Sequence, residues 1–304
     1  MSVSSDLNII HSFDETYLEA YQAWNPFYPE AELDMRFFLG DQWSEKEKRD
    51  LSAEGRNAFV FNRIRPVVNM ITGYQRQHRL SSVVVPVENS EQKTADQLSE
   101  CLMHVMSYGN GYQNISNCFS GAVKTGLNLA SVWLDYRDDP VNGDIRFARE
   151  PWNGFIMDPY FTNLDLSDCS YIIRRKYLPV DVVASLLPGQ DKEIRQLFFK
   201  GWDRDDKFTW LPYQRNPSGP TLMAYDEYYR QNWKSQPVLV DMETGQFRDW
   251  EGDKELFLQL KSVNPNIELS SRQQRFIELH IIVNGTLMRT EVNPYGLDRD
   301  WETR

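Results

Sequence analysis

Residues 276–292 read FIELHIIVNGTLMRTEV, which is two runs of strand-forming residues on either side of Asn284-Gly285. A two-residue type I′ turn needs a positive φ at both central positions, and Asn-Gly is a pair that adopts it readily. The stretch therefore predicts a β-hairpin between strands 276–283 and 286–292.

Working outward from this hairpin, the hydrophobic period changes along the chain. Alternation and β-branched runs predict strands at 131–136, 145–149, 155–158, 171–177, 222–233 and 238–250. Helical spacing predicts helices at 30–38, 45–54, 63–79, 91–130 (broken near 109–111), 179–187, 192–200 and 251–262. The sequence therefore predicts an α+β fold. We expect a mainly helical part at 1–130 and a mixed, β-rich part at 131–304.

Several short motifs predict where individual helices and strands begin or end. Ser12 and Ser44 each precede a Glu by three residues, which predicts two capping boxes at helix starts. Asn62 is expected to cap a helix that carries Pro66 in its first turn, with Val67, Val68, Met70, Ile71 and Tyr74 on its apolar side. The run 82–88 is β-branched but contains Pro86, so it predicts an edge strand.

Composition excludes several classes of protein. Thirty-three Lys and Arg against 44 Asp and Glu give 304 residues a net charge of −11, which argues against a basic surface for nucleic acid. No window approaches 18 consecutive apolar residues, so no membrane span is expected, and the start MSVSSDLNII does not read as a secretory signal. Cys101, Cys118 and Cys169 are odd in number and dispersed, which indicates reduced thiols rather than a disulfide framework.

Motifs for catalysis are weak. The sequence contains neither a P-loop nor a G-x-S-x-G elbow, and Gly109-Asn110-Gly111 is better explained as a break in a helix than as a dinucleotide loop. The four histidines show no metal-binding spacing. Acidic clusters occur at Asp138-Asp139 and at 203–206, both in turn-rich stretches where a solvated loop explains them simply. We therefore expect no catalytic residue, no cofactor-binding residue and no metal site.

Two functional alternatives remain open from residue chemistry. A carbohydrate-active hydrolase would use paired carboxylates held roughly 5–10 Å apart. A single-stranded nucleic-acid-binding protein would use the basic helix with Arg63, Arg65, Arg76 and Arg79. Its base-stacking candidates are Trp202, Tyr228, Tyr229 and Trp233, which are equally suited to a protein interface.

The order of several segments resembles one family. Residues 36–43 read RFFLGDQW and residues 61–75 read FNRIRPVVNMITGYQ. With these two segments, the chain resembles the N-terminal portion of portal proteins from short-tailed bacteriophages over most of residues 30–180. Further matching segments are Val85-Pro86-Val87, Thr94-Ala95-Asp96, Trp133-Leu134-Asp135-Tyr136, Met157-Asp158-Pro159 and Asn293-Pro294-Tyr295-Gly296.

This resemblance implies a non-enzymatic subunit of a ring, usually of twelve copies, at one capsid vertex. Terminase would drive double-stranded DNA in through the ring, and the DNA would leave through it at infection. Implied partners are further copies of the chain, the major capsid protein, the scaffolding protein, terminase, the head-to-tail adaptor and tail proteins, and the DNA itself. The implied location is the virion, with assembly in the host cytoplasm. An acidic channel wall would keep the duplex from sticking.

Portal chains of this kind are longer, so we expect this one to lack much of the stem, clip and crown and to correspond to the wing. No DNA-contacting residue is therefore assigned. Rings close by head-to-tail contacts, which predicts a lateral interface that pairs two different surfaces. Phe13, Tyr17 and Trp24 are candidates for contacting a neighbouring subunit, and packing on their own chain is the competing interpretation.

Overall fold

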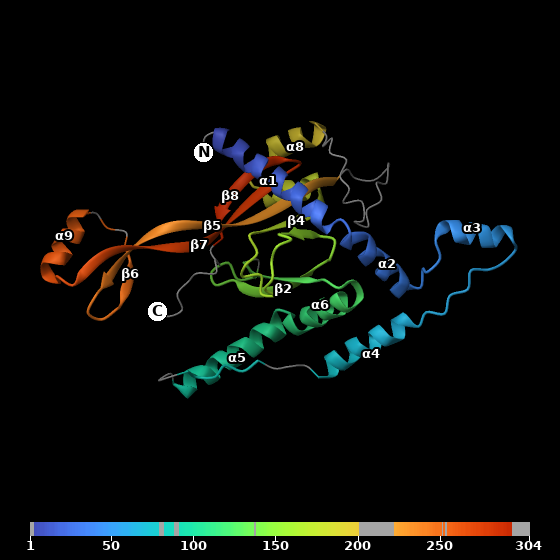
Figure 1. Ribbon diagram of the computed structural model, residues 1–304, viewed down its shortest axis with the longest axis horizontal. Helices are drawn as coiled ribbons and strands as arrows, with labels where there is room; N and C mark the ends of the chain where they lie inside the picture. The colour runs from blue at the N-terminus through green and yellow to red at the C-terminus, as the bar shows by residue number, and fades with distance from the viewer. Residues whose placement is uncertain are drawn as a thin grey trace. The chain divides into compact units, whose positions relative to one another are not determined.

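The computed structural model describes residues 3–78, 82–87, 91–136, 138–200, 222–250, 252 and 254–293 (Figure 1). Arg79, Glu88, Trp202, the acidic cluster 203–206 and the segment 294–296 lie outside these residues. The described chain forms two compact units. Residues 22–155 make one, here called the helical unit, and residues 3–21, 156–200 and 222–293 make the other, called the sheet unit.

The helical unit is built around its last helix, α6. Its helices are α2 (Phe27–Leu39), α3 (Glu45–Ala53), α4 (Ile64–Gln77), α5 (Gln92–Tyr108) and α6 (Gly111–Thr125). Strands β1 (Leu129–Asp135) and β2 (Asp144–Glu150) follow as an antiparallel pair. Helix α6 packs against α2, α4, α5 and both strands, so it links most of the elements of this unit.

Small residues make the packing around α6 possible. Its buried positions are Gly111, Ser116, Gly121 and Thr125. A Cβ on Gly121 would lie 1.5 Å from Nδ2 of Asn128, so a larger residue there would require the Asn128 side chain to move. Among the described residues 22–155, the buried hydrophobic side chains are Tyr28, Ala31, Val68, Ala95 and Phe155. The helical unit therefore has a thin apolar core for its length.

The sheet unit contains a six-stranded sheet with the order β3-β4-β5-β7-β8, in which β6 pairs with β5. Its strands are β3 (Phe155–Met157), β4 (Tyr171–Pro179), β5 (Leu222–Asp241), β6 (Phe247–Asp249), β7 (Ile267–Val283) and β8 (Thr286–Val292). Its helices are α1 (Val3–Trp24, with residues 3–21 in this unit), α7 (Val180–Leu186), α8 (Asp191–Lys200) and α9 (Lys254–Val263).

Helices cover both faces of this sheet. Met223 and Tyr225 of β5 pack in a buried cluster with Val183 of α7 and Ile194 of α8. Tyr228, three residues after Tyr225, lies on the opposite face, where Phe13 of α1 contacts its ring at 5.5 Å. Because successive strand residues face opposite sides, β5 supplies both layers of the core. The chain has the predicted α+β fold.

The β-hairpin predicted at residues 276–292 is confirmed. Strand β7 ends at Val283 and β8 begins at Thr286. Asn284 and Gly285 have φ values of 46° and 77°, as a type I′ turn requires. The Ser44–Glu47 capping box is also confirmed, because the Glu47 N–H donates to Ser44 Oγ and Glu47 Oε2 accepts from the Ser44 N–H.

Three local predictions are wrong, each because a distant partner decides the structure. Helix α1 begins at Val3, so Ser12 is internal, and its hydroxyl accepts a hydrogen bond from Arg230. Strand β5 continues through Pro237, whose carbonyl accepts the Trp250 N–H, instead of ending near residue 233. The described residues 82–87 belong to no strand, because the Val84 N–H is bound by Ser99 Oγ.

Beyond Arg230, the sheet narrows to a two-stranded ribbon. Strands β5 and β7 pair over 17 positions, from Tyr225↔Val283 to Asp241↔Ile267, which spans roughly 55 Å. Within β5, strand β4 pairs with residues 222–230. In Figure 1 the ribbon carries β6 and α9 at its far end.

Buried His280 makes the sheet unit sensitive to acid. Its Nδ1 lies 3.0 Å from Thr290 Oγ1, and its ring contacts Tyr228 at 5.6 Å. Burial lowers the pKa of His280 below its usual 6.5, with Glu278 opposing and Arg230 reinforcing this shift. A depressed pKa in the folded state means that the unfolded chain binds the proton more readily, so stability is lost as the pH falls below about 6.5.

We therefore expect His280→Gln to flatten the pH dependence of stability. Glutamine keeps a polar partner for Thr290 but carries no titrating proton. The measurement is urea unfolding of both proteins at neutral pH and at about one unit below the usual histidine pKa. A parallel loss of stability in the two proteins would assign the acid sensitivity to the carboxylates instead.

Candidate functional site

Helix α4 presents an apolar surface that the described part of the chain leaves largely exposed. This surface, called the α4 face, consists of Ile64, Val67, Met70, Ile71 and Tyr74, whose residues are between 40% and 69% exposed. Such a contiguous group of large apolar side chains on a helix marks an interaction surface rather than ordinary surface variation.

The helical period explains which side chains of α4 are buried and which remain exposed. With about 100° per residue, Val68 and Thr72 lie at one edge of the apolar arc, and these two residues are buried. Helix α4 packs on α2 and α6. Arg65 lies outside the apolar arc and approaches the Phe38 ring of α2 at 6.0 Å. The apolar face is therefore separated from the cationic side of the helix.

Neighbouring segments extend the apolar character of this part of the chain. Phe59 and Phe61 precede α4, and Val83 and Val85 follow it. All four are more than two-thirds exposed. The segments on either side of α4 thus add four exposed apolar side chains to those of the α4 face.

Asn62 fixes the start of α4 to the end of α2. Its Nδ2 donates to the Phe38 carbonyl at 2.8 Å, and its Oδ1 accepts the Arg65 N–H at 3.0 Å. The predicted capping role of Asn62 is confirmed, and the bond to α2 is a second role that the sequence did not indicate. One amide side chain therefore positions the α4 face.

Asn62→Ala should lower the free energy of unfolding by about 1–2 kcal/mol, because it removes a helix cap and an interhelical hydrogen bond. Asn62→Asp should cost less, since the carboxylate still accepts the Arg65 N–H and is favoured at a helix N-terminus. Urea unfolding of the two variants checks this order. Equal losses would mean that the bond to Phe38 carries the whole effect.

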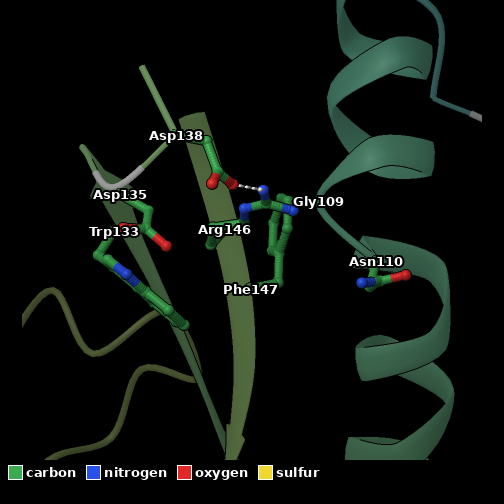
Figure 2. A pocket seen from close by; sticks show the side chains of 7 residues that line it. All are labelled: Gly109, Asn110, Trp133, Asp135, Asp138, Arg146 and Phe147. Carbon is green, nitrogen blue, oxygen red and sulfur yellow. Dashed lines mark hydrogen bonds and ion pairs between the residues drawn. The ribbon is translucent and has the colours of Figure 1, made fainter. Parts of the chain in front are cut away.

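A cavity of about 430 Å³ lies beside the junction of α5 and α6 (Figure 2). The residues that line it are Gly109, Asn110, Trp133, Asp135, Asp138, Arg146 and Phe147. The Arg146 guanidinium lies 3.2 Å from Asp138 and 3.5 Å from Asp144, and it stacks on the Tyr108 ring at 4.7 Å. Its charge is therefore already compensated, and the other described residues that line the cavity carry no positive charge.

The acidic pair at this loop lacks the electrostatics of a hydrolase. Asp139 accepts the N–H groups of Val141 and Asn142 at 2.9 and 3.1 Å, which lowers the pKa of its carboxyl. A general acid needs a raised pKa. Asp138 is occupied by Arg146. Among the described residues, no group of three His, Cys, Asp or Glu side chains could hold a metal ion.

The three base-stacking candidates within the described residues differ in their exposure. Tyr228 is fully buried, so its predicted role as an exposed stacking residue is wrong. Tyr229 is partly buried and its hydroxyl donates to Glu227, while burial and Glu227 raise the pKa of that phenol. Trp233 is exposed on the ribbon. The nucleic-acid alternative thus loses Tyr228, one of its stacking candidates.

Two of the N-terminal aromatic residues pack on their own chain. Phe13 is fully buried against Tyr228, and the Arg175 guanidinium lies 4.7 Å from the centre of the Tyr17 ring. Phe13 is therefore not accessible to a neighbouring subunit, so that part of the prediction is wrong. Tyr17 is only partly buried, and its contact with a neighbour stays a prediction. Trp24 is partly buried and meets Phe27 edge-on at 5.6 Å.

The sheet unit holds a buried ion pair that the sequence did not reveal. The β4–β5 register places Arg175 opposite Asp226. Nε and Nη2 of Arg175 donate to the two carboxylate oxygens at 2.6 and 2.8 Å, and Nη1 donates to the Tyr17 hydroxyl. This geometry is fully paired, which indicates a structural role rather than a catalytic one.

Within the described part of the chain, no helix is both long and apolar enough to span a bilayer. The profile of one protein family, described as phage P22-like portal protein, matches residues 14–296. A search of curated proteins finds no match to the chain.

Proposed function

Because the chain belongs to the family of phage P22-like portal proteins, we propose that it assembles into its ring through the α4 face. The chain is a subunit of a bacteriophage portal, the part of the virion at a capsid vertex through which double-stranded DNA is packaged and ejected and to which the tail attaches. Proteins of this family are structural components rather than enzymes.

The single observation that carries the proposal is the exposure of the α4 face. A helix that buries only the edge of its apolar arc has room for a second apolar surface. In a closed ring, every copy contributes one surface to each of two neighbours, so the partner of the α4 face is a different surface of the next copy. The thin core of the helical unit supports this, because assembly would bury what folding leaves exposed.

Finer aspects of the function are part of the same proposal. We propose a ring of twelve copies that meets the major capsid protein, the scaffolding protein, terminase, and the head-to-tail adaptor and tail proteins, with assembly in the host cytoplasm. Residues 1–130 and 131–304 would form two parts of the wing. Terminase would supply ATP hydrolysis, since the sequence has no P-loop, and the portal would use no catalytic, cofactor or metal-binding residue. The net charge of −11 favours a duplex that slides without binding.

Electron microscopy of the purified protein, with native mass spectrometry of the same sample, tests ring formation. We expect annular particles with a central hole and one discrete mass of about a dozen subunits. A protein that stays monomeric over the whole accessible concentration range would overturn the proposal. Particles of another closed number would correct the copy number and leave the ring in place.

A further inference from the structure

Residues 82–87 form an extended segment that pairs with no strand of the described chain. Ser99 of α5 anchors it, since Ser99 Oγ accepts the Val84 N–H at 2.9 Å and lies 3.5 Å from the Val84 carbonyl. Both backbone groups of Val84 therefore point toward α5, and the segment is held against that helix along one side (Figure 1).

The opposite side of the segment has the properties of a strand edge. In an extended chain, successive residues direct their N–H and C=O groups to alternate sides. Val83 and Val85 therefore point these groups away from α5. Pro86, which has no N–H, shares the side of Val84, so the proline does not interrupt the outward edge. The side chains of Val83 and Val85 are exposed as well.

The helical unit also contains an incomplete sheet. Among the described strands, β1 and β2 pair only with each other. The outer edge of β2 faces the helices, because the Phe147 carbonyl accepts Nδ2 of Asn114 at 2.8 Å. A Cβ on Gly109 would lie 2.5 Å from the Ile145 carbonyl, so the backbone of the α5–α6 junction lies against the same edge.

The outer edge of β1 is open. Phe147 lies opposite Val132, and Ile145 lies opposite Leu134. Residues that face each other across an antiparallel pair direct their backbone groups either both inward or both outward. Val132 and Leu134 therefore direct theirs away from β2, and no backbone hydrogen bond within the described residues occupies that edge. Val132 is 58% exposed. Natural sheets cover such edges.

We propose that segment 82–87 of one copy adds as a third strand to the β1 edge of the neighbouring copy. This inference rests on the ring of the proposed function and names a contact within it. The segment and the edge are different surfaces of the same chain, which is the head-to-tail arrangement that a closed ring needs. The segment is fixed on α5, whereas the β1 edge lies on the far side of the sheet from the α5–α6 junction, so the two meet between copies.

Strand addition combines backbone hydrogen bonds with side-chain contacts. The outward N–H and C=O groups of Val83 and Val85 would pair with those of Val132 and its neighbours on β1. A two-stranded sheet is marginal in water, and a third strand stabilises it. The exposed valines would be covered in the same step.

Mixed single-cysteine variants test this contact. Val85→Cys and Val132→Cys are prepared separately, mixed, dissociated, reassembled and oxidised. Each copy then carries one new thiol, so a disulfide between the two positions joins two copies, and we expect covalent dimers but no longer products. The double variant should instead give a ladder of multimers. The parent protein, with Cys101, Cys118 and Cys169, and each single variant alone are the controls. The variants Val83→Cys and Ala130→Cys test the same contact with the segment shifted by two residues along β1.

A backbone test complements the cross-link. Val132→Pro removes an outward N–H without removing a β1–β2 hydrogen bond, and Val132→Thr is the matched control with its N–H intact. We expect the proline variant alone to raise the concentration for half-assembly by about tenfold or more. Rings that form but give no cross-link at any of the four positions would overturn the strand contact and leave the ring standing. Absence of rings in the parent protein would overturn both.

Discussion

Met70→Glu should convert assembled rings into folded monomers. Met70 is 69% exposed in the single chain, so a carboxylate there is well solvated and folding is unaffected. If the α4 face is covered by the next copy, the same carboxylate is buried without a partner, which costs several kcal/mol. Since each 1.4 kcal/mol is a factor of ten, the association constant of each contact should fall by about 100-fold or more.

Native mass spectrometry and sedimentation of the variant at matched concentrations measure this effect. Leu164→Glu is the matched control, because Leu164 is 97% exposed in a loop of the sheet unit and gives the same change of charge. It should assemble as the parent protein does. Persistence of rings in Met70→Glu would remove the α4 face from the interface, and loss of rings in both variants would indicate a general effect of negative charge.

Arg175→Met should be the most destabilising single substitution in the sheet unit. The side chains of Arg175 and Asp226 are 1% and 0% exposed, and the two form a bidentate pair. Removing only the arginine leaves a buried carboxylate without its main partner, which typically costs 3–5 kcal/mol. The Tyr17 hydroxyl and ring would lose their cationic neighbour at the same time.

The control is Arg195→Met, in which a surface arginine loses its contacts with Asp181 and Asp191. Exposed pairs of this kind contribute about 0–1 kcal/mol. Urea unfolding should therefore separate the two arginines clearly. The double variant Arg175→Met/Asp226→Leu should recover much of the loss, because it leaves no buried charge. A cost for Arg175→Met no larger than that for Arg195→Met would contradict the structural role of the pair.

The elements that could be predicted from sequence are those whose chemistry is local. Asn284-Gly285 defines its turn through the two φ angles it can adopt, and Ser44 with Glu47 closes a capping box within one helical turn. The first turns of α1 contact residues more than a hundred positions away, as Ser12 does with Arg230. The continuous strand β5 pairs around Pro237 with residues of β7 about thirty positions away. No local pattern around Ser12 or Pro237 carries that information.

The same distinction applies to the site. The apolar side of α4 could be predicted from its period, but a period does not tell whether a neighbour covers the side chains. The burial of Tyr228 and the pairing of Arg175 with Asp226 arise from the register between β4, β5 and α1, which sequence spacing does not reveal. The sequence of the two strands does not single out this pair, because Asp226 is followed by Glu227 and Arg175 lies between Arg174 and Lys176.

The β5–β7 ribbon responds differently to forces from different directions. Its hydrogen bonds run perpendicular to the strands, so tension along the ribbon shears its β5–β7 residue pairs together. A force that separates the strands at the tip would instead break the pairs one after another. The ribbon therefore resists tension along its axis more strongly than a force that separates its strands. A protein bound to α9 would transmit an axial force to β5, the strand that carries Asp226 and Tyr228.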